Sequence, residues 1–301
     1  MVDSVLYSGS FDHTIKVWNL ASGECLKTIQ AHDNGVSCLR YESGVLVTGS
    51  SDNTLKVWTR DLNSCLHTLK GHAAEVTCLY HDGKTIVSGS CDNTLRKWNL
   101  KTGEMIATLR GHEDYVINLM FDESVIISGS FDRSIKIWDF DTGECKRTLT
   151  GHGGGIRGIK FDRKYIVSGS VDRTVRVWDM SSYECVAVLR GHTGEVWSVQ
   201  MLYTGLGGNS KLNRIISGGR DGVRVWEVDD DNKDFKQSHM HIPTDKGHSN
   251  SGIISIDLDP CTIACSSFDK SIALYEFDKK WRQTRVILER RNSLEEIQMN
   301  E

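Results

Sequence analysis

The amino-acid sequence predicts an all-β protein, a seven-bladed β-propeller whose blades are four-stranded antiparallel sheets. The first observation behind this prediction is a ladder of tryptophans that stand 40 residues apart: Trp18, Trp58, Trp98, Trp138 and Trp178. Trp226 and Tyr275 continue the ladder at spacings of 48 and 49 residues. The second observation is that apolar residues alternate in short runs within each period, which is typical of strands. Repeats of this size bury their faces against their neighbours, so we expect one continuous domain.

The repeat at residues 71–110 illustrates the four expected strands. In chain order they are Val76–Leu79, Thr85–Ser90, Thr94–Asn99 and Met105–Arg110. The turns between them read His81-Asp82-Gly83, Asp92-Asn93 and Lys101-Thr102-Gly103. Glycine, aspartate and asparagine favour tight turns, and the runs between them are too short for helices. Strands joined by such short turns pair as an antiparallel sheet.

The first repeat differs from the others. Six repeats carry the first strand, which begins near Val36, Val76, Val116, Ile156, Val196 and Ile253, whereas seven carry the second and third. The first blade therefore lacks its innermost strand in this chain. Upstream residues or the tail after Arg290 could supply that strand, and the tail is the weaker candidate because Ser293–Ile297 alternates only weakly. We assign residues 1–288 to the propeller and residues 289–301 to a polar C-terminal tail.

Composition excludes several classes of protein. The chain has 301 residues, of which 39% are hydrophobic and 25% are charged, and its net charge is -4. It has no block of lysine or arginine, so nucleic acid is not an expected partner. It also lacks an apolar run long enough to span a membrane and an N-terminal signal core. We therefore expect a cytoplasmic or nuclear protein without membrane contact.

The nine cysteines follow the repeat. Cys25, Cys65, Cys145 and Cys185 occupy one repeat position, and Cys38 and Cys78 occupy another. Apolar strand-like surroundings predict that they are reduced and buried as small hydrophobic side chains. Cys261 and Cys265 have no second pair that could complete a zinc site, so no metal is expected.

Two dipeptides recur with the tryptophan ladder. Gly-His pairs begin at residues 71, 111, 151, 191 and 247, and Trp-Asp or Trp-Asn pairs begin at 18, 98, 138 and 178. On these motifs the chain resembles the WD-repeat propellers over essentially its whole length. The resemblance implies a hydrogen-bonded network of histidine, serine, aspartate and tryptophan within each blade, for example His72, Ser88, Asp92 and Trp98. Such repeated sets are structural rather than catalytic triads, so we expect neither an enzyme nor a cofactor.

The same resemblance places partner-binding positions on the top face of the propeller, beside the first residue of each inner strand and just before each turn aspartate. The residues that we expect to bind a peptide there are Phe11, Glu75, Tyr115, Phe131, Arg157, Glu195, Trp197, Arg220 and Phe268. Aromatic side chains often dominate interface energetics, and arginine holds phosphate or carboxylate in bidentate fashion. Arg133 and Arg173, which follow turn aspartates, are expected to lie on exposed turns outside this site.

Several functions stay open at this stage. The leading hypothesis is a module that binds a peptide segment of a partner, with Arg157 and Arg220 on an acidic or phosphorylated residue. Proline-free turns and Gly-Glu-Cys strands resemble the F-box/WD-repeat substrate receptors of ubiquitin ligases, which implies a receptor for phosphorylated motifs. The alternatives are a non-catalytic scaffold for multiprotein assembly, or a reader of a basic peptide near Glu75 and Glu195 in the central channel. All three imply protein or peptide partners and a place in a larger complex.

Overall fold

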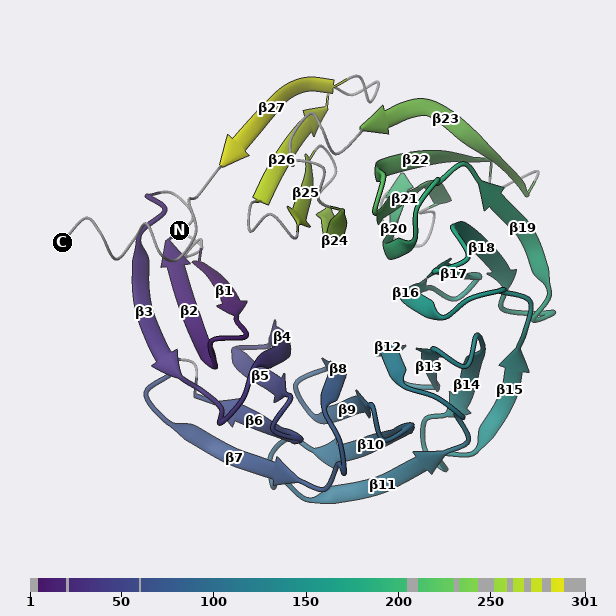
Figure 1. The fold of residues 1–301 in the computed structure, drawn as a ribbon. Coiled ribbons are helices and arrows are strands. Elements are labelled where there is room, and N and C mark those ends of the chain that lie inside the picture. The colour runs from purple at the N-terminus through teal and green to yellow at the C-terminus, as the bar shows by residue number, and fades with distance from the viewer. Residues whose placement is uncertain are drawn as a thin grey trace. The chain divides into compact units, whose positions relative to one another are not determined.

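The fold of this chain is built from antiparallel sheets (Figure 1). A computed structural model describes residues 5–19, 22–59, 61–204, 211–229, 233–242, 252–258, 262–267, 272–277 and 283–289. Within these ranges, six sheets have four strands and one has three, and neighbouring strands are antiparallel. The all-β repeat of four-stranded sheets is thus confirmed. A closed ring of seven blades stays a prediction.

The chain forms two compact units, Met1–Thr150 and Gly151–Glu301. The first unit contains four sheets. Its strands are β1 (Val5–Gly9), β2 (Thr14–Asn19) and β3 (Cys25–Gln30); β4 (Val36–Glu42), β5 (Val45–Ser50), β6 (Thr54–Trp58) and β7 (Cys65–Lys70); β8 (Val76–His81), β9 (Thr85–Ser90), β10 (Thr94–Asn99) and β11 (Met105–Arg110); and β12 (Val116–Phe121), β13 (Val125–Ser130), β14 (Ile135–Asp139) and β15 (Cys145–Leu149).

The second unit contains three sheets. Its strands are β16 (Ile156–Phe161), β17 (Tyr165–Ser170), β18 (Thr174–Asp179) and β19 (Cys185–Arg190); β20 (Val196–Thr204), β21 (Lys211–Gly219), β22 (Gly222–Asp229) and β23 (Asp234–Ile242); and β24 (Ile253–Leu258), β25 (Thr262–Ser267), β26 (Ile272–Phe277) and β27 (Gln283–Glu289). Strand order within every sheet follows the chain.

The expected strands of residues 71–110 agree with β8 to β11, except that β8 continues to His81. The first sheet consists of β1, β2 and β3, as the missing inner strand predicted. The expected tail was residues 289–301; Glu289 ends β27, and the rest lies outside the described residues, so its assignment stays a prediction.

The turn between the second and third strands of each repeat is set by its aspartate. Asp92 Oδ1 accepts hydrogen bonds from the Thr94 amide at 2.9 Å and from Thr94 Oγ1 at 2.6 Å. Asn93 between them has a φ of 66°, in the left-handed region that asparagine and glycine tolerate best. The same turn recurs at Asp52 and Asp132, which explains why aspartate repeats with the strands.

A chain of hydrogen bonds links the tryptophan to the turn aspartate in five of the sheets. The Trp98 indole Nε1 donates to Ser88 Oγ at 2.9 Å, Ser88 donates to His72 Nε2 at 2.8 Å, and His72 Nδ1 donates to Asp92 at 2.9 Å. This order requires a neutral imidazole, because Nε2 must accept. The other sets are His32-Thr48-Asp52-Trp58, His112-Ser128-Asp132-Trp138, His152-Ser168-Asp172-Trp178 and His192-Ser217-Asp221-Trp226. The expected network is confirmed for these five sheets.

Protonation states in the network follow from its contacts. Burial lowers the pKa of His72 below its usual 6.5, although Asp92 opposes the shift. Burial alone would raise the pKa of Asp92, but hydrogen bonds from Thr94, the Ala73 amide and His72 outweigh it and lower this pKa from 3.8 to about 2. The folded state therefore favours a neutral histidine beside an ionised aspartate.

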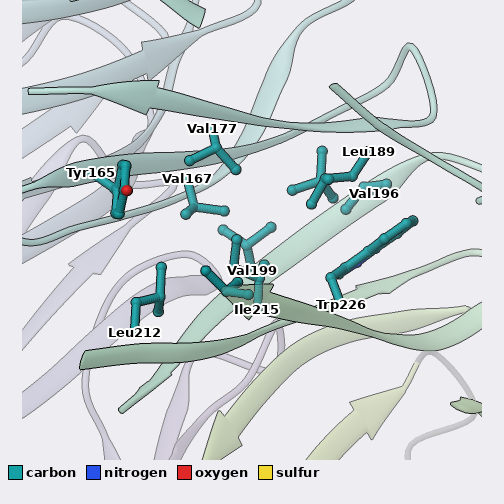
Figure 2. Packing of buried hydrophobic residues seen from close by; sticks show 11 residues of the cluster. Tyr165, Val167, Val177, Leu189, Val196, Val199, Leu212, Ile215 and Trp226 are labelled. Atoms are coloured by element: carbon teal, nitrogen blue, oxygen red, sulfur yellow. The ribbon is translucent and has the colours of Figure 1, made fainter. Parts of the chain in front are cut away.

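Apolar side chains fill the space between neighbouring sheets. Figure 2 shows this packing in the second unit, where side chains of β16–β19 meet side chains of β20–β23. Tyr165, Val167, Val177 and Leu189 contribute from the first of these sheets, and Val196, Val199, Leu212, Ile215 and Trp226 from the second. All are buried, so the tryptophan ladder is part of the core between sheets.

The cysteine prediction was wrong for the outer strands. Cys25, Cys65 and Cys145 are exposed, and Cys185 is half-buried. These residues begin the last strand of their sheets, which among the described residues has a paired neighbour on one side only. The prediction holds for Cys78, which is buried, whereas Cys38 at the same repeat position is half-buried.

Candidate functional site

The predicted site residues that the structure describes lie at one end of their own sheets, which we call the loop end. It is formed by the loop before the inner strand and by the aspartate turn. Two backbone hydrogen bonds show the arrangement: the Phe131 amide donates to the Tyr115 carbonyl at 2.9 Å, and the Arg220 amide donates to the Glu195 carbonyl at 3.0 Å. The same bond joins Ser51 to Gly35, Cys91 to Glu75 and Val171 to Gly155. The two sequence positions singled out in each repeat are therefore direct neighbours.

A β-bulge occurs at the start of every inner strand. The register between β16 and β17 shifts between Ile156 and Gly158, and the register between β20 and β21 shifts between Val196 and Ser198. Arg157 and Trp197 are thus the extra residues of two bulges. Bulges redirect side chains and are common next to functional sites. The alternation of the sequence does not reveal them, because a bulge adds one residue without changing the residue types around it.

In the second unit, Glu195 lies between Trp197 and Arg157. The Trp197 indole Nε1 donates to Glu195 Oε2 at 2.9 Å, and Arg157 Nε lies 4.0 Å from the same oxygen. The Arg157 and Glu195 side chains are 38% and 36% exposed, so the ion pair itself contributes little stability. Its main effect is to keep the cation and the carboxylate in place at the loop end.

Arg220 completes this cluster. Its backbone packs over two glycines, because a β-carbon at Gly252 would lie 2.7 Å from Arg220 Cα and one at Gly194 would lie 2.6 Å from Arg220 Cβ. The Trp197 ring also covers Gly252, with Cη2 2.8 Å from that β-carbon position. These glycines allow the close approach, whereas any larger residue would displace Trp197 or Arg220. We call Arg157, Glu195, Trp197 and Arg220 the arginine cluster.

The chemistry of the arginine cluster suits an anion. It combines two guanidinium groups with one carboxylate, and Glu195 already accepts the Trp197 hydrogen bond. The Arg220 side chain is exposed, and no hydrogen bond or ion pair of its guanidinium occurs within the described residues. A carboxylate or phosphate could therefore bind Arg220 without breaking an existing contact.

In the first unit, Tyr115 and Phe131 form an aromatic pair. Their ring centroids are 6.4 Å apart and the rings are inclined by 66°, an edge-to-face arrangement. Tyr115 is 45% exposed, and Phe131 is half-buried beneath it. This aromatic pair presents an apolar surface at the loop end, and its role in binding a peptide stays a prediction.

Acidic groups gather near this pair. Burial and the carboxylates of Glu75, Asp92 and Asp114 raise the pKa of Cys91. Cys91 lies just before the turn aspartate of its sheet, and its amide donates to the Glu75 carbonyl at 2.9 Å. The loop end of this unit is thus acidic and aromatic, whereas the arginine cluster carries an excess of positive charge. Asp114 belongs to this surface and was missed, because it stands one residue outside the positions that the resemblance marked.

Phe11 lies at the aspartate turn of the first sheet. It is 79% exposed, and its ring covers Gly35 in the loop before β4. Among the described residues, no inner strand stands beside β1 in this sheet. The exposure of Phe11 alone therefore does not indicate a ligand. Phe268 lies outside the described residues, and its place in the site stays a prediction.

A cavity of about 530 Å³ in the first unit is lined by Asp33, Asp52, Asn53, Thr54, Lys56, Thr68, Lys70, Gly71 and His72. Several of these groups already have partners within the unit. Lys56 donates to the Ala31 carbonyl at 2.6 Å, and Asp52 accepts from His32 and Thr54. The cavity therefore has less free bonding capacity than its polar lining suggests.

In the described part of the chain, no group of three or more histidine, cysteine, aspartate or glutamate side chains could hold a metal ion. Over the same residues, no helix has the length and apolar character needed to cross a membrane.

Comparison with known proteins adds family information. The WD40 model, described as "WD domain, G-beta repeat", matches residues 2–19, 23–59, 63–99, 103–139, 143–179 and 183–227, more than two thirds of the chain. A segment of 34 residues is 53% identical to the "Uncharacterized WD repeat-containing protein C126.01c" of Schizosaccharomyces pombe, and it covers 11% of this chain and 9% of that relative. The crystal structure of the computationally designed Ika8 protein is similar at a TM-score of 0.77 and 27% identity, over 95% of this chain and 85% of that chain.

Proposed function

The chain belongs to the WD-repeat family, and from this premise we propose that it binds a peptide segment of a partner protein at the loop ends of its sheets. WD repeats indicate a protein–protein interaction or scaffold module, and WD-repeat proteins are generally non-catalytic. The repeated histidine, serine and aspartate of this chain agree with a structural role, because each set is engaged in its own sheet.

The observation that carries the proposal is the position of Glu195. Its carboxylate accepts from Trp197, its carbonyl accepts from the Arg220 amide, and it lies beside Arg157. One residue therefore fixes the other three members of the arginine cluster in place. Preorganised side chains lose less entropy on binding, which favours a recognition site over a solvated surface.

The ligand that fits the arginine cluster best is an acidic or phosphorylated side chain. Two arginines outnumber one glutamate, and guanidinium groups bind carboxylate and phosphate with paired hydrogen bonds. The indole ring of Trp197 supplies a flat apolar surface for a neighbouring residue of the peptide. The bound segment would be extended or looped, with its acidic group held between Arg157 and Arg220.

A finer assignment extends this proposal. The seven sheets would close as a seven-bladed propeller with the loop ends on its top face, and the chain would act in a larger complex as a substrate receptor of a ubiquitin ligase. Proline-free turns and Gly-Glu-Cys strands support this assignment at the level of sequence. A phosphorylated motif is the ligand that such a receptor would select.

A basic peptide is the second candidate ligand, favoured by the first unit. Burial and the nearby carboxylates of Glu75, Asp92 and Asp114 raise the pKa of Cys91, so these three acidic groups all lie near that residue. Tyr115 and Phe131 stand at the same end of the neighbouring sheet and could hold the cation over an aromatic face. An arginine or lysine side chain is the group that this surface would recognise.

A peptide array with the full chain as probe tests both candidates. The array would carry matched peptides in which one central residue is phosphoserine, glutamate, serine or arginine. The arginine cluster predicts that phosphoserine and glutamate peptides are retained over serine peptides. Retention of the arginine peptides alone would overturn that assignment and favour the first-unit surface. Equal retention of all four peptides would contradict recognition of charge both at the arginine cluster and at the first-unit surface.

A further inference from the structure

The loop before β20 carries a threonine next to the arginine cluster. Thr193 is exposed, and its amide donates to Asp221 Oδ2 at 2.9 Å. The next residue, Gly194, lies against Arg220, because a β-carbon on this glycine would be 2.6 Å from Arg220 Cβ. Glu195 follows, and its carbonyl accepts from the Arg220 amide at 3.0 Å. Thr193 therefore immediately precedes the backbone that contacts Arg220.

The hydroxyl group of Thr193 is not required by the fold of its loop. Its Oγ1 lies 3.4 Å from Asp221 Oδ2, beyond the usual O–H···O range of about 2.5–3.0 Å. The equivalent position in four other sheets has no hydroxyl group, and the amide there still donates to the turn aspartate. These residues are Asp33, Ala73, Glu113 and Gly153. The exposed hydroxyl of Thr193 is therefore accessible to a modifying enzyme without loss of the shared backbone contact.

Two of the equivalent loops already carry a negative charge at this position. The Asp33 amide donates to Asp52 Oδ2 at 3.1 Å, and the Glu113 amide donates to Asp132 Oδ2 at 3.1 Å. Both sheets therefore keep a second carboxylate on the residue that binds the turn aspartate. A phosphate group carries a charge of about −1.5 to −2 at neutral pH. At Thr193 it would add negative charge at a position where the fold accepts an acidic side chain.

Charges around Thr193 would direct such a phosphate toward Arg220. The Asp221 carboxylate would repel it, whereas the exposed Arg220 guanidinium would attract it. Arg224 already contacts Asp221, with 3.4 Å between Nη2 and Oδ2. Consecutive α-carbons are about 3.8 Å apart, so a phosphate on the residue before Gly194 lies within reach of the long Arg220 side chain. Guanidinium groups hold phosphate with paired hydrogen bonds.

The residues before Thr193 suit one class of protein kinase. The segment reads Arg190-Gly191-His192-Thr193, and Arg190 is exposed at the end of β19. Arginine-directed serine/threonine kinases select a hydroxyl group that follows an arginine by three residues. Their acidic substrate grooves pair with the guanidinium of that arginine. Arg190 therefore marks Thr193 as an acceptor for such a kinase.

We propose that Thr193 is a phosphorylation site, and that its phosphate occupies the arginine cluster in place of the acidic group of a bound peptide. Thr193 Oγ1 attacks the γ-phosphorus of ATP, so a new O–P bond forms and the bond to the departing ADP breaks. A carboxylate base of the kinase takes the hydroxyl proton. The phosphorylated chain thus competes with its own peptide ligand. This inference rests on the proposed function, because it requires that Arg157 and Arg220 bind a phosphate group.

The modification itself is tested on the full chain with ATP and an arginine-directed serine/threonine kinase. Peptide mass spectrometry should find phosphate on Thr193 of the native protein. Arg190→Ala should remove most of this phosphate, since the kinase loses its basic contact. Absence of phosphate on Thr193 in the parent chain would overturn the proposal.

The effect on binding is measured by titration calorimetry with the phosphoserine peptide of the array. Phosphorylation of Thr193 should weaken this binding by about tenfold or more, because a tethered phosphate acts at an effective concentration on the order of millimolar. Ala73→Glu, which adds a charge at the equivalent loop position of the first unit, is the matched control and should bind as the parent chain does. Equal affinity of the phosphorylated and unmodified chains would overturn the proposal.

Phosphorus NMR separates this inference from the proposed function. If the unmodified chain binds no phosphoserine peptide, the proposed function fails, and the phosphate on Thr193 is then observed directly. Nearby arginines favour its dianion, so its titration midpoint should lie at lower pH in the phosphorylated parent than in the Arg157→Ala and Arg220→Ala double variant. Equal midpoints in the two chains would overturn the inference, whether or not the peptide binds.

Discussion

The indole Nε1 of Trp197 donates a hydrogen bond to Oε2 of Glu195 at 2.9 Å, and Arg157 Nε lies 4.0 Å from that oxygen. One carboxylate oxygen of Glu195 thus contacts both the indole of Trp197 and the side chain of Arg157. The indole hydrogen bond keeps this carboxylate in place at the loop end. The arginine cluster depends on this shared contact.

Trp197→Phe should weaken binding of an acidic peptide by about fivefold, because one net hydrogen bond is worth about 1 kcal/mol. The ring still covers Gly252, so the free energy of unfolding should change little. Isothermal titration calorimetry measures the affinity. The matched test is the same substitution in a Glu195→Gln background, where it should have no effect. An equal loss in both backgrounds would show that Trp197 acts by another route.

Ser88→Ala should lower the free energy of unfolding by about 2–4 kcal/mol, because it leaves two buried polar groups, His72 Nε2 and Trp98 Nε1, without partners. Ser8→Ala should cost only about 1 kcal/mol, since Ser8 is half-buried and serves Trp18 alone among the described residues. Urea denaturation measures both. Equal losses of unfolding free energy in the two variants would contradict the difference in hydrogen-bond partners between Ser88 and Ser8.

Stability should fall on acidification in two steps. Burial lowers the pKa of His32, His72 and His81 below 6.5, so the unfolded chain binds protons before the folded one. This contribution is fully present above pH 6.5 and is lost as the pH falls below it. A second loss should follow below 3.8, because the pKa of Asp92 is lowered to about 2 in the folded state. Urea midpoints from pH 8 to pH 3 measure both steps, and a higher midpoint at pH 5 than at pH 7.5 would contradict them.

Arg173→Asn should stabilise the protein by about 1 kcal/mol, because Arg173 has a φ of 70° in the left-handed region that asparagine tolerates better. Asn53 and Asn93 occupy the same turn position with φ values of 69° and 66°. The substitution should leave the affinity for an acidic peptide unchanged. Arg163→Asn, on a turn without positive φ, is the control and should give no gain in thermal unfolding. A loss of peptide binding with Arg173→Asn would place Arg173 in the site.

Cysteine alkylation should distinguish the exposed cysteines of the outer strands from the buried cysteines of the core. Iodoacetamide should modify Cys25, Cys65 and Cys145 in the native protein, because their side chains are exposed. Cys78 should react only after denaturation, since burial raises its pKa to about 12 and shields the thiol. Peptide mass spectrometry measures both. Rapid native modification of Cys78 would contradict the packing of β8 against its neighbours.

Repeated features of the fold were predictable from the sequence. The period of the tryptophans located the sheets, and the aspartate turns located the strand ends, because both depend on contacts within one repeat. The expected pairing of His72 with Ser88 and Asp92 is present in the structure. The exposure of the outer-strand cysteines was not predictable. Alternation of apolar residues identifies a strand, but it does not show which face of that strand is covered by neighbouring elements.

The candidate site was predictable in its members but not in its arrangement. The expected site residues included all four members of the arginine cluster, Arg157, Glu195, Trp197 and Arg220. The β-bulges at Arg157 and Trp197 were not expected, because they arise from the register between neighbouring strands. Phe11 was expected among the aromatic residues of the site, and it is 79% exposed at the turn of a sheet with three described strands. Asp114 was missed because it stands one residue outside the positions that the resemblance marked.

The central claim is that Arg157 and Arg220 hold the acidic group of a peptide. Its most direct test is the affinity of a phosphoserine peptide from the array for the Arg157→Ala and Arg220→Ala double variant, measured by titration calorimetry. Each charge-assisted hydrogen bond contributes about 1.5–3 kcal/mol, so we predict a loss of about a hundredfold or more. The control Arg163→Ala, an exposed arginine on a turn outside the cluster, should bind as the parent chain does. Unchanged affinity in the double variant, with its fold intact, would contradict the claim.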